Sequence, residues 1–493
     1  MRRDARTDVR DIAERSASLA HRSYAPPLSP LRFPGTTILN AASLLNPAVL
    51  GTAMVVTFMT LIMTKRMSAI AALIAVPILF GIIAGAGPGL GDMMIEGVVQ
   101  VTPTALMLAF AVLYFAILMD AGLFEPLVRR VLTAVGDDPV RISVGTAVLA
   151  MAVSLDGDGT TTALIVTTAF LPVYRRVGMN PLILGTLLAL SNALMNFVPW
   201  GGPSARAATA VHVDLTNDVF LPLLPAMAIG LLAVLIMAWR FGHSERRRLA
   251  ALTGLDAAAA GTNSSPSPII HHSVDNATAR RPHLFWFNLA LTIGLVLGMI
   301  LGLAPLSVLM MGAFAIALTV NYPRLKEQKE RLAAHSENVV NVVVLIFAAG
   351  AFTGILNGAG MADAMAKAAL SIIPPSIGPL LAPITAIASM PLTFVMSNDA
   401  YYFGVVPVIA QTAAHYGIAP EVIARASLLG QPVHTLTPLL APIYLVCGLL
   451  GVDVADAQRF ALKWAVLTTL IVLAAAILTG AIPLAGDGVA LAP

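Results

Sequence analysis

The sequence predicts an all-α polytopic membrane protein with about 10 transmembrane helices plus two re-entrant hairpins in an inverted-topology repeat. Three observations lead to this prediction. Of the 493 residues, 58% are hydrophobic and 11% are charged, whereas a soluble domain carries about 25% charged residues. Most apolar runs are ~17 residues or longer, enough to cross a ~30 Å hydrocarbon core. Finally, each half of the chain contains a polar motif between long apolar runs, at 154–162 in the first half and at 396–401 in the second.

The composition also excludes several classes of protein. The formal net charge of +3 reflects basic loops in a membrane protein, so it indicates no nucleic-acid partner. Cys447 is the single cysteine, which rules out an intrachain disulfide and a thiolate metal cluster. The 38 glycines and 33 prolines fit helices that break and pack closely within a bilayer.

The chain divides into two long apolar parts with polar stretches around them. Residues 1–45 are rich in arginine and proline and lack the apolar core of a secretory signal peptide. We expect them to be disordered, or to follow from a start codon placed too far upstream. A first transporter repeat covers 46–241, a cytoplasmic linker rich in Ala, Ser, Pro and Asn covers 242–283, a second repeat covers 284–482, and 483–493 form a C-terminal tail.

Two regions, 140–174 and 376–415, are apolar on both sides of a polar motif. We predict that each is a hairpin that enters the membrane and returns, with its tip buried, because irregular backbone at membrane depth must be covered by protein. The uninterrupted apolar spans are predicted at 45–63, 68–85, 102–119, 181–199, 219–239, 284–303, 305–321, 338–356, 421–447 and 461–482.

Basic residues orient these spans. With Lys65 on the cytoplasmic side and each hairpin returning to its own side, every cluster of Lys and Arg between the spans falls in the cytoplasm. The first hairpin then enters from the cytoplasm and the second from the outside. This layout places both chain ends outside, which conflicts with the arginine-rich stretch 1–45 and agrees with a misplaced start.

The two halves repeat one another. Aligning Asp158 with Ser397 gives an offset of 239 (397 − 158), and an offset one smaller pairs Gly122 with Gly360. Together with opposite hairpin entry, these matches indicate an inverted-topology repeat, whose paired interruptions point to a transporter's substrate site. The other residues that match at the offset of 239 are Gly178 with Gly417, Pro181 with Pro420, Pro199 with Pro438, and Pro203 with Pro442.

The first hairpin tip combines carboxylates with hydroxyls. Asp156 and Asp158 flank Gly157, and three threonines follow. Hard oxygens suit a cation or a metal-bound substrate, and Thr hydroxyls suit carboxylate oxygens. A carboxyl group in low dielectric also suits a proton carrier. Alternatively, one Asp caps the second helix of the hairpin. The candidate substrate-binding residues here are Ser154, Asp156, Gly157, Asp158, Gly159, Thr160 and Thr161.

The second hairpin tip supplies the equivalent candidates Ser397, Asn398 and Asp399. Ser397 or Asp399 alternatively serves only as a helix N-cap, which needs no ligand. With Asp156 and Asp158, Asp399 completes the set of three candidate metal ligands, and the same three carboxyl groups are candidate proton carriers.

A second break follows each hairpin by ~20 residues. In the first half it offers Asn196, Gly201, Gly202 and Arg206 as substrate-binding candidates. Arg206 suits bidentate binding of a carboxylate, or alternatively extends to the lipid headgroups.

The second half carries the counterpart of this break at 430–438. There Thr435 is a substrate-binding candidate and His434 a candidate proton relay. Alternatively, His434 is a hydrogen-bonded structural residue.

At these residues the chain resembles the citrate–divalent-metal:proton symporter family, CitMHS, of the ion transporter superfamily. The similarity covers about 47–482, so 1–45 and 250–283 have no counterpart. The segments that carry the resemblance are 58–66, 120–124, 154–162, 178–184, 199–206 and 396–399.

The resemblance implies co-uptake of a metal–citrate complex with protons across the cell (inner) membrane, by a homodimer in contact with membrane lipid. Mg²⁺, Ca²⁺ or a similar ion is then part of the substrate, held by Asp156, Asp158 and Asp399, and no cofactor is permanently bound. Related dicarboxylate carriers bind sodium at Ser-Asn-Thr tips, which this chain lacks. Chelation also removes two charges from citrate, which reduces its repulsion by the three carboxylates.

Two rival functions remain at this stage. A sodium-coupled di/tricarboxylate symporter differs in its driving ion and its indifference to metal. An intramembrane aspartyl protease would need a Gly-x-Gly-Asp order, and Leu155 stands where the first Gly belongs. The protease would also leave the repeat and the hairpins without a purpose, so we expect a transporter and no enzyme.

Overall fold

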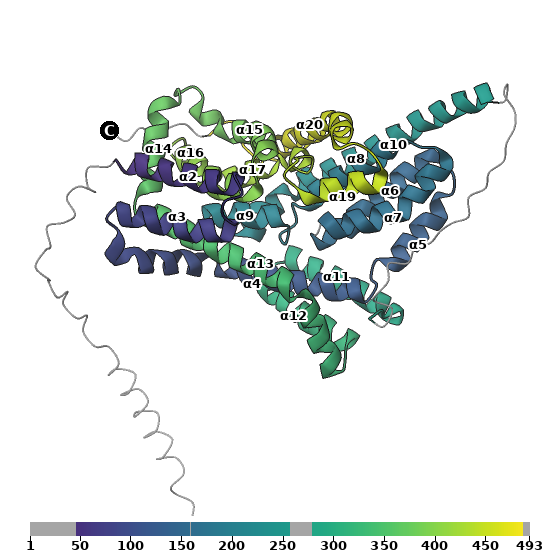
Figure 1. Cartoon of the computed structure of the whole chain (residues 1–493), viewed down its shortest axis with the longest axis horizontal. Coiled ribbons are helices and arrows are strands. Elements are labelled where there is room, and N and C mark those ends of the chain that lie inside the picture. Colours follow the sequence, from purple (N-terminus) through teal and green to yellow (C-terminus); the bar gives the residue numbers. More distant parts are fainter. Residues whose placement is uncertain (1–45, 158, 257–278, 487–493) are drawn as a thin grey trace, which may run out of the picture. The chain divides into compact units, whose positions relative to one another are not determined.

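The structure, a computed structural model, describes residues 46–157, 159–256 and 279–486, and every regular element in this part is helical (Figure 1). The predicted N-terminal extension 1–45 lies outside the described residues. The first half contains α2 (Pro47–Met63), α3 (Ala69–Ile83), α4 (Leu90–Asp120), α5 (Glu125–Val135), α6 (Pro139–Val153), α7 (Gly159–Val177), α8 (Pro181–Met195), α9 (Gly202–Val211) and α10 (Leu221–Asp256).

The second half repeats this order with shorter pieces near its end. It contains α11 (Phe285–Ile300), α12 (Leu306–Asn321), α13 (Leu325–Gly358), α14 (Met361–Ile372), α15 (Leu381–Val395), α16 (Val406–Ala414), α17 (Pro420–Leu428), α18 (Gln431–His434), α19 (Ala441–Leu450) and α20 (Val454–Leu478).

Six helical segments in the described residues are long and apolar enough to cross a bilayer, and six shorter apolar helices accompany them. This confirms the all-α membrane class, while the number of about 10 spans stays a prediction. The six long segments are Gly87–Asp120, Leu215–Leu252, Pro282–Ile300, Leu325–Gly358, Gly378–Val395 and Val454–Leu478.

Several boundaries differ from the predicted ones: α4 begins at Leu90 rather than at 102, and α13 begins at Leu325 rather than at 338. The span expected over 421–447 is wrong, because the chain breaks there into α17, α18 and α19. Hydropathy registers only that this run is apolar, whereas Pro432 and Pro438 lack the N–H groups that a continuous helix needs. Helix α10 continues to Asp256, so the linker predicted from 242 begins inside a helix. An ion pair of 2.6 Å between Arg248 and Glu245 supports this extension.

Both predicted hairpins are pairs of helices joined by a short polar turn. Helix α6 ends in a 3₁₀ turn, Ser154–Asp156, before α7 begins at Gly159. Helix α15 ends at Val395, and a π-helical stretch, Ala400–Val405, leads into α16. Re-entry of each tip to its own side of the membrane stays a prediction.

The backbone follows the repeat beyond the glycines and prolines that reveal it in the sequence. Helices α8 and α17 begin at equivalent prolines, and α9 and α19 begin at equivalent positions. Aspartates accept backbone N–H groups at equivalent N-caps before α10 and α20. The paired positions with positive φ are Gly178 (77°) with Gly417 (71°), His212 (56°) with Gly451 (72°), and Gly122 (86°) with Gly360 (67°).

The repeats pack crosswise. Helix α9 of the first repeat contacts α16 and α17 of the second, and α19 of the second contacts α7 and α8 of the first. Each broken helix therefore lies against the hairpin of the other repeat, which brings the two polar tips toward a common region.

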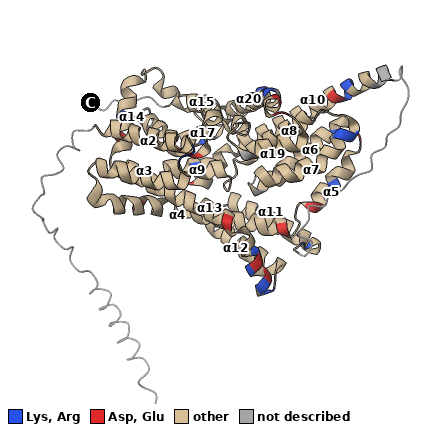
Figure 2. Cartoon of the chain, in the orientation of Figure 1, with Lys and Arg blue, Asp and Glu red and all other residues tan. Residues whose placement is uncertain are grey.

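Charged residues lie mostly away from this region. Figure 2 shows them gathered around α5, the far end of α10 and the start of α13. Asp120, the last residue of α4, is 8% exposed. Its Oδ2 accepts from Arg331 at 3.2 Å and contacts His335 Nε2 at 2.8 Å. Asp120 therefore joins the end of α4 to α13.

Helices α4 and α13 lie side by side along much of their length (Figure 1). Glycines make this approach possible: a Cβ atom on Gly97 would lie 2.8 Å from the Cα atom of Gly354, and one on Gly350 would lie 2.6 Å from Val101 Cγ2. Small residues allow membrane helices to pack this closely.

We predict that Gly354→Leu forces α4 and α13 apart and destabilises the protein by about 1–3 kcal/mol, the usual cost of overpacking. Thermal unfolding of the purified protein measures this effect. Gly312→Leu is the matched control, because a Cβ atom on this helical glycine meets nothing within 4 Å. Equal unfolding midpoints for the two variants would contradict the packing account.

Candidate functional site

The first hairpin tip is held by the helix that follows it. Gly157 adopts a left-handed conformation (φ 79°), and its N–H donates to Ser154 O at 3.1 Å. The buried Ser154 hydroxyl accepts from Asn192 Nδ2 of α8 at 3.3 Å, and Asn196 Nδ2 donates to Asn192 Oδ1 at 3.3 Å. The tip and the end of α8 thus share one chain of amide hydrogen bonds.

The break after α8 closes over the same tip. Trp200 Nε1 donates to the carbonyl oxygen of Leu155 at 2.7 Å, and its ring lies 5.2 Å from that of Phe115. A Cβ atom on Gly201 would overlap the backbone of Asn196, so only glycine fits there. Trp200 is therefore a positioning residue that the sequence analysis did not include among its candidates.

Several first-tip candidates fall outside what the structure describes. Residue 158 and the side chain of Asp156 lie outside the described part, so their roles as metal ligands, proton carriers or caps stay predictions. Thr160 and Thr161 lie in the first turn of α7. In the described residues, no three His, Cys, Asp or Glu side chains form a metal-binding group.

The second tip is tied to α18. Ser397 Oγ accepts from Ala400 N at 3.2 Å, so Ser397 caps this turn, as its alternative role requires. Asn398 Oδ1 accepts from Gln431 Nε2 at 3.3 Å, and the same amide group lies 2.9 Å from Tyr402 Oη. Gln431 is a second contributor missing from the candidate list. The sequence signal that marks it is its amide side chain within the break at 430–438.

Arg206 and Asp399 join the two repeats. Arg206 Nε donates to Asp399 Oδ1 at 2.7 Å, and 23% and 20% of the two side chains remain exposed. Arg206 belongs to α9 and Asp399 to the second hairpin tip, so two candidates 193 positions apart meet. This contact gives Arg206 a partner inside the protein. It also shows that Asp399 does more than cap a helix.

His434 of α18 has a defined orientation. Its Nδ1 lies 2.6 Å from the carbonyl oxygen of Thr393, so Nδ1 carries the hydrogen and Nε2 the lone pair. Nε2 is buried and has no hydrogen-bond partner among the described residues, and the side chain is 1% exposed. The neighbouring Thr435 hydroxyl donates to Pro432 O at 3.0 Å.

These elements surround a cavity of about 210 Å³. Both repeats contribute to it, with apolar walls from α8, α19 and α20. It is smaller than the ~300–1,000 Å³ of drug-sized sites, which fits a small polar substrate. Its polar side chains include Thr186, Asn192, Asn196, Asn398, Gln431, His434 and Thr435, and its lining also includes the glycines Gly157, Gly159 and Gly202.

The Arg206–Asp399 pair lies beside this cavity. Asn398, which precedes Asp399, lines it, as does Gly202, where a Cβ atom would lie 2.9 Å from Arg206 Nη1. Three further candidates contact residues at the cavity or at the second hairpin tip. Ser154 accepts from Asn192, Gly201 packs against the backbone of Asn196, and Ser397 accepts from Ala400 N.

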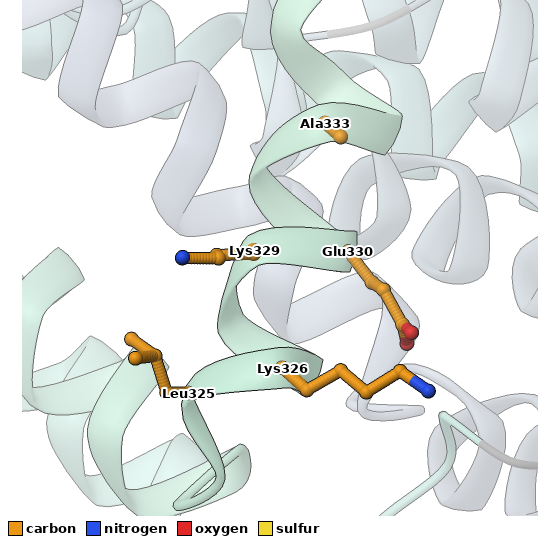
Figure 3. Close-up of a pocket in the computed structure, with 5 residues that line it drawn as sticks. All are labelled: Leu325, Lys326, Lys329, Glu330 and Ala333. Carbon is orange, nitrogen blue, oxygen red and sulfur yellow. The ribbon is translucent and has the colours of Figure 1, made fainter.

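A second hollow lies on the surface of α13 and has a volume of about 460 Å³. In Figure 3, Lys329 points away from Lys326 and Glu330, and every lining residue comes from one helix. Because this hollow is lined by one helix of the second repeat, it cannot enclose a solute between the two repeats. We therefore take the 210 Å³ cavity as the candidate site.

Comparison with known proteins identifies relatives over most of the chain. The family model described as "Citrate transporter", CitMHS, matches residues 58–430. The "Citrate transporter" of Bacillus subtilis (strain 168) is 52% identical over 435 residues, covering 88% of this chain and 99% of the relative. The "Mg(2+)/citrate complex secondary transporter" of the same organism is 47% identical over 436 residues, with the same coverage.

Solved structures support the fold. The YdaH transporter of Alcanivorax borkumensis aligns with a TM-score of 0.51 at 15% identity, covering 90% of this chain and all of that one. MtrF of Neisseria gonorrhoeae aligns with a TM-score of 0.57 at 13% identity, covering 90% and 97%. These similarities and the apolar helices make this a multi-pass protein of the cell membrane. The chain belongs to the citrate transporter family CitMHS.

Proposed function

We propose that this protein is a secondary transporter that takes up citrate complexed with a divalent metal ion, in symport with protons. The observation that carries the proposal is the cavity between the repeats, where neutral amides lie beside a cationic and an anionic side chain. Amide N–H groups and a guanidinium group suit carboxylate oxygens, while carboxylate and amide oxygens suit Mg²⁺ or Ca²⁺. A B. subtilis relative named for the Mg²⁺/citrate complex supports the same substrate.

The metal explains how so acidic a substrate enters a site with carboxylates. Citrate is close to a trianion at neutral pH, and a bound divalent ion removes two of its charges. Asp399 borders the cavity, and Asp156 and Asp158, which flank the lining residue Gly157 in the sequence, are our further candidate carboxylates, so we expect free citrate to meet like charges there. We also propose that the transporter works as a homodimer and that no cofactor is permanently bound.

Protons would enter through a group that meets the substrate. Among the candidates, His434 has an acceptor nitrogen that is buried beside the cavity and has no hydrogen-bond partner in the part of the chain that the structure describes. Asp399 already has a partner of opposite charge in Arg206. We therefore propose His434 as the proton-coupling residue, with Asp156 and Asp158 as the further candidates.

The proposed function makes three predictions, and the first of them concerns the coupling ions. Uptake of labelled citrate into proteoliposomes that contain the purified protein will require a divalent ion and stop with EDTA. It will also collapse with a protonophore and be indifferent to sodium. Uptake that depends on sodium and ignores the metal would contradict the proposal and favour the sodium-coupled di/tricarboxylate symporter.

The second prediction concerns His434. His434→Gln will reduce proton-driven accumulation of citrate by at least about tenfold, a typical loss when a proton-transfer group is removed. Exchange of internal for external citrate needs no net proton movement and will continue. The control is His415→Gln, because His415 is exposed and its Nδ1 contacts the carbonyl oxygen of Gln411, one turn earlier, at 2.9 Å. Unchanged accumulation and pH dependence in His434→Gln would remove His434 from the coupling mechanism.

The third prediction concerns Trp200. Trp200→Phe keeps the aromatic packing against Phe115 but leaves the Leu155 carbonyl without its donor, at a cost of about 1–3 kcal/mol. Citrate affinity should fall because the first tip loses its support. Trp286→Phe is the matched control, since Trp286 is 64% exposed. Equal citrate affinities for the two variants would show that the indole bond does not position the site.

A further inference from the structure

The ion pair between Arg206 and Asp399 is the one described charge contact at the candidate site. Its Nε–Oδ1 distance is 2.7 Å, and it connects α9 of the first repeat to the hairpin tip of the second. Both side chains are mostly buried yet keep about a fifth of their surface accessible. Neighbours of both residues line the cavity, so the pair lies beside it.

Each member of the pair matches one half of a metal–carboxylate complex. The Arg206 guanidinium has a planar set of donors that fits a carboxylate. Asp399 offers the hard, anionic oxygen that Mg²⁺ and Ca²⁺ prefer. In the structure the two groups satisfy each other, so each already holds a partner of opposite charge.

We propose, resting on the proposed function, that Arg206 and Asp399 form an internal ion pair that only the metal–citrate complex replaces. One substrate carboxylate takes the place of Asp399 on Arg206, and the chelated metal takes the place of Arg206 on Asp399. The two repeats, which the Arg206–Asp399 ion pair joins directly, are then joined through the bound substrate. Arg206 and Asp399 each still have an opposite charge beside them.

The same replacement of the ion pair disfavours the binding of free citrate or of a free divalent ion. Free citrate can bind Arg206, but it releases Asp399 to face further carboxylates of the same ligand. A free divalent ion can bind Asp399, but it leaves Arg206 mostly buried and unpaired. An uncompensated buried charge is strongly unfavourable, so each component alone is disfavoured by the group that it strands. Specificity for the complex thus follows from a repulsive element as well as an attractive one.

Citrate binding to the purified full-length protein tests this proposal. Affinity for labelled citrate is measured with excess Mg²⁺ and with EDTA, and their ratio is the readout. For the wild-type protein we expect a ratio of at least about 10. In Asp399→Asn, Arg206 is no longer neutralised and no carboxylate is released. Metal-free citrate should then bind about tenfold more tightly and the ratio should approach 1, a change of about 1.4 kcal/mol.

The control is Asp363→Asn, which removes the same charge from an exposed ion pair with Lys367 (2.9 Å) on α14. It should keep the wild-type ratio. A large ratio in the wild-type protein that is unchanged in Asp399→Asn would overturn the ion-pair proposal and leave the proposed function intact. Absence of citrate binding by the wild-type protein with and without metal would overturn both.

A double variant covers the case in which Asp399→Asn does not fold. Arg206→Gln combined with Asp399→Asn keeps the net charge and leaves no charge unpaired at this position. The proposal predicts that it binds neither form of citrate at concentrations that saturate the wild-type protein. Metal-dependent binding at wild-type affinity in this double variant would overturn the proposal.

Discussion

Backbone polar groups at membrane depth must find hydrogen-bond partners within the protein, because hydrocarbon offers none. In each repeat, the break that follows the hairpin supplies side-chain donors. These donors bond to backbone carbonyl groups near the end of the first hairpin helix, where the helical hydrogen bonds stop. In the first repeat, the Trp200 indole donates to Leu155 O. In the second, His434 donates to Thr393 O, and the Thr437 hydroxyl donates to Phe394 O. Hydrogen bonds therefore connect each hairpin tip to the break that follows it in the same repeat. The cavity lies where these tips and breaks come together.

The crosswise packing of the repeats brings the tip and the break of both repeats into one site. Because α9 lies against α16 and α17 while α19 lies against α7 and α8, each repeat completes the other's hairpin. The repeats are equivalent in backbone but not in chemistry. The first contributes Arg206 and a chain of asparagines, and the second contributes Asp399 and His434. This asymmetry gives the site distinct places for an anion, a cation and a proton.

Much of this architecture is visible in the sequence, because helix breaks are local signals. The polar tips and the Gly and Pro matches predicted both hairpins and the repeat. Long-range partners carry no such signal, so the bond between Trp200 and Leu155 and the place of Gln431 in the cavity required the structure. Hydropathy also merged α17, α18 and α19 into one span, since it does not register a missing N–H group. Asp156 and Asp158 remain predictions from the sequence alone.

The central claim is that metal and citrate bind together between the repeats, beside Asp399. Anomalous diffraction from crystals grown with Mn²⁺ and citrate tests it most directly, because the signal locates the metal without reference to the protein model. The account predicts a peak in the cavity between Asn196 and Asn398, at about 2.0–2.6 Å from an Asp399 oxygen, the range for hard divalent ions and carboxylates. A peak elsewhere, with the Arg206–Asp399 pair intact and the cavity empty, would contradict it.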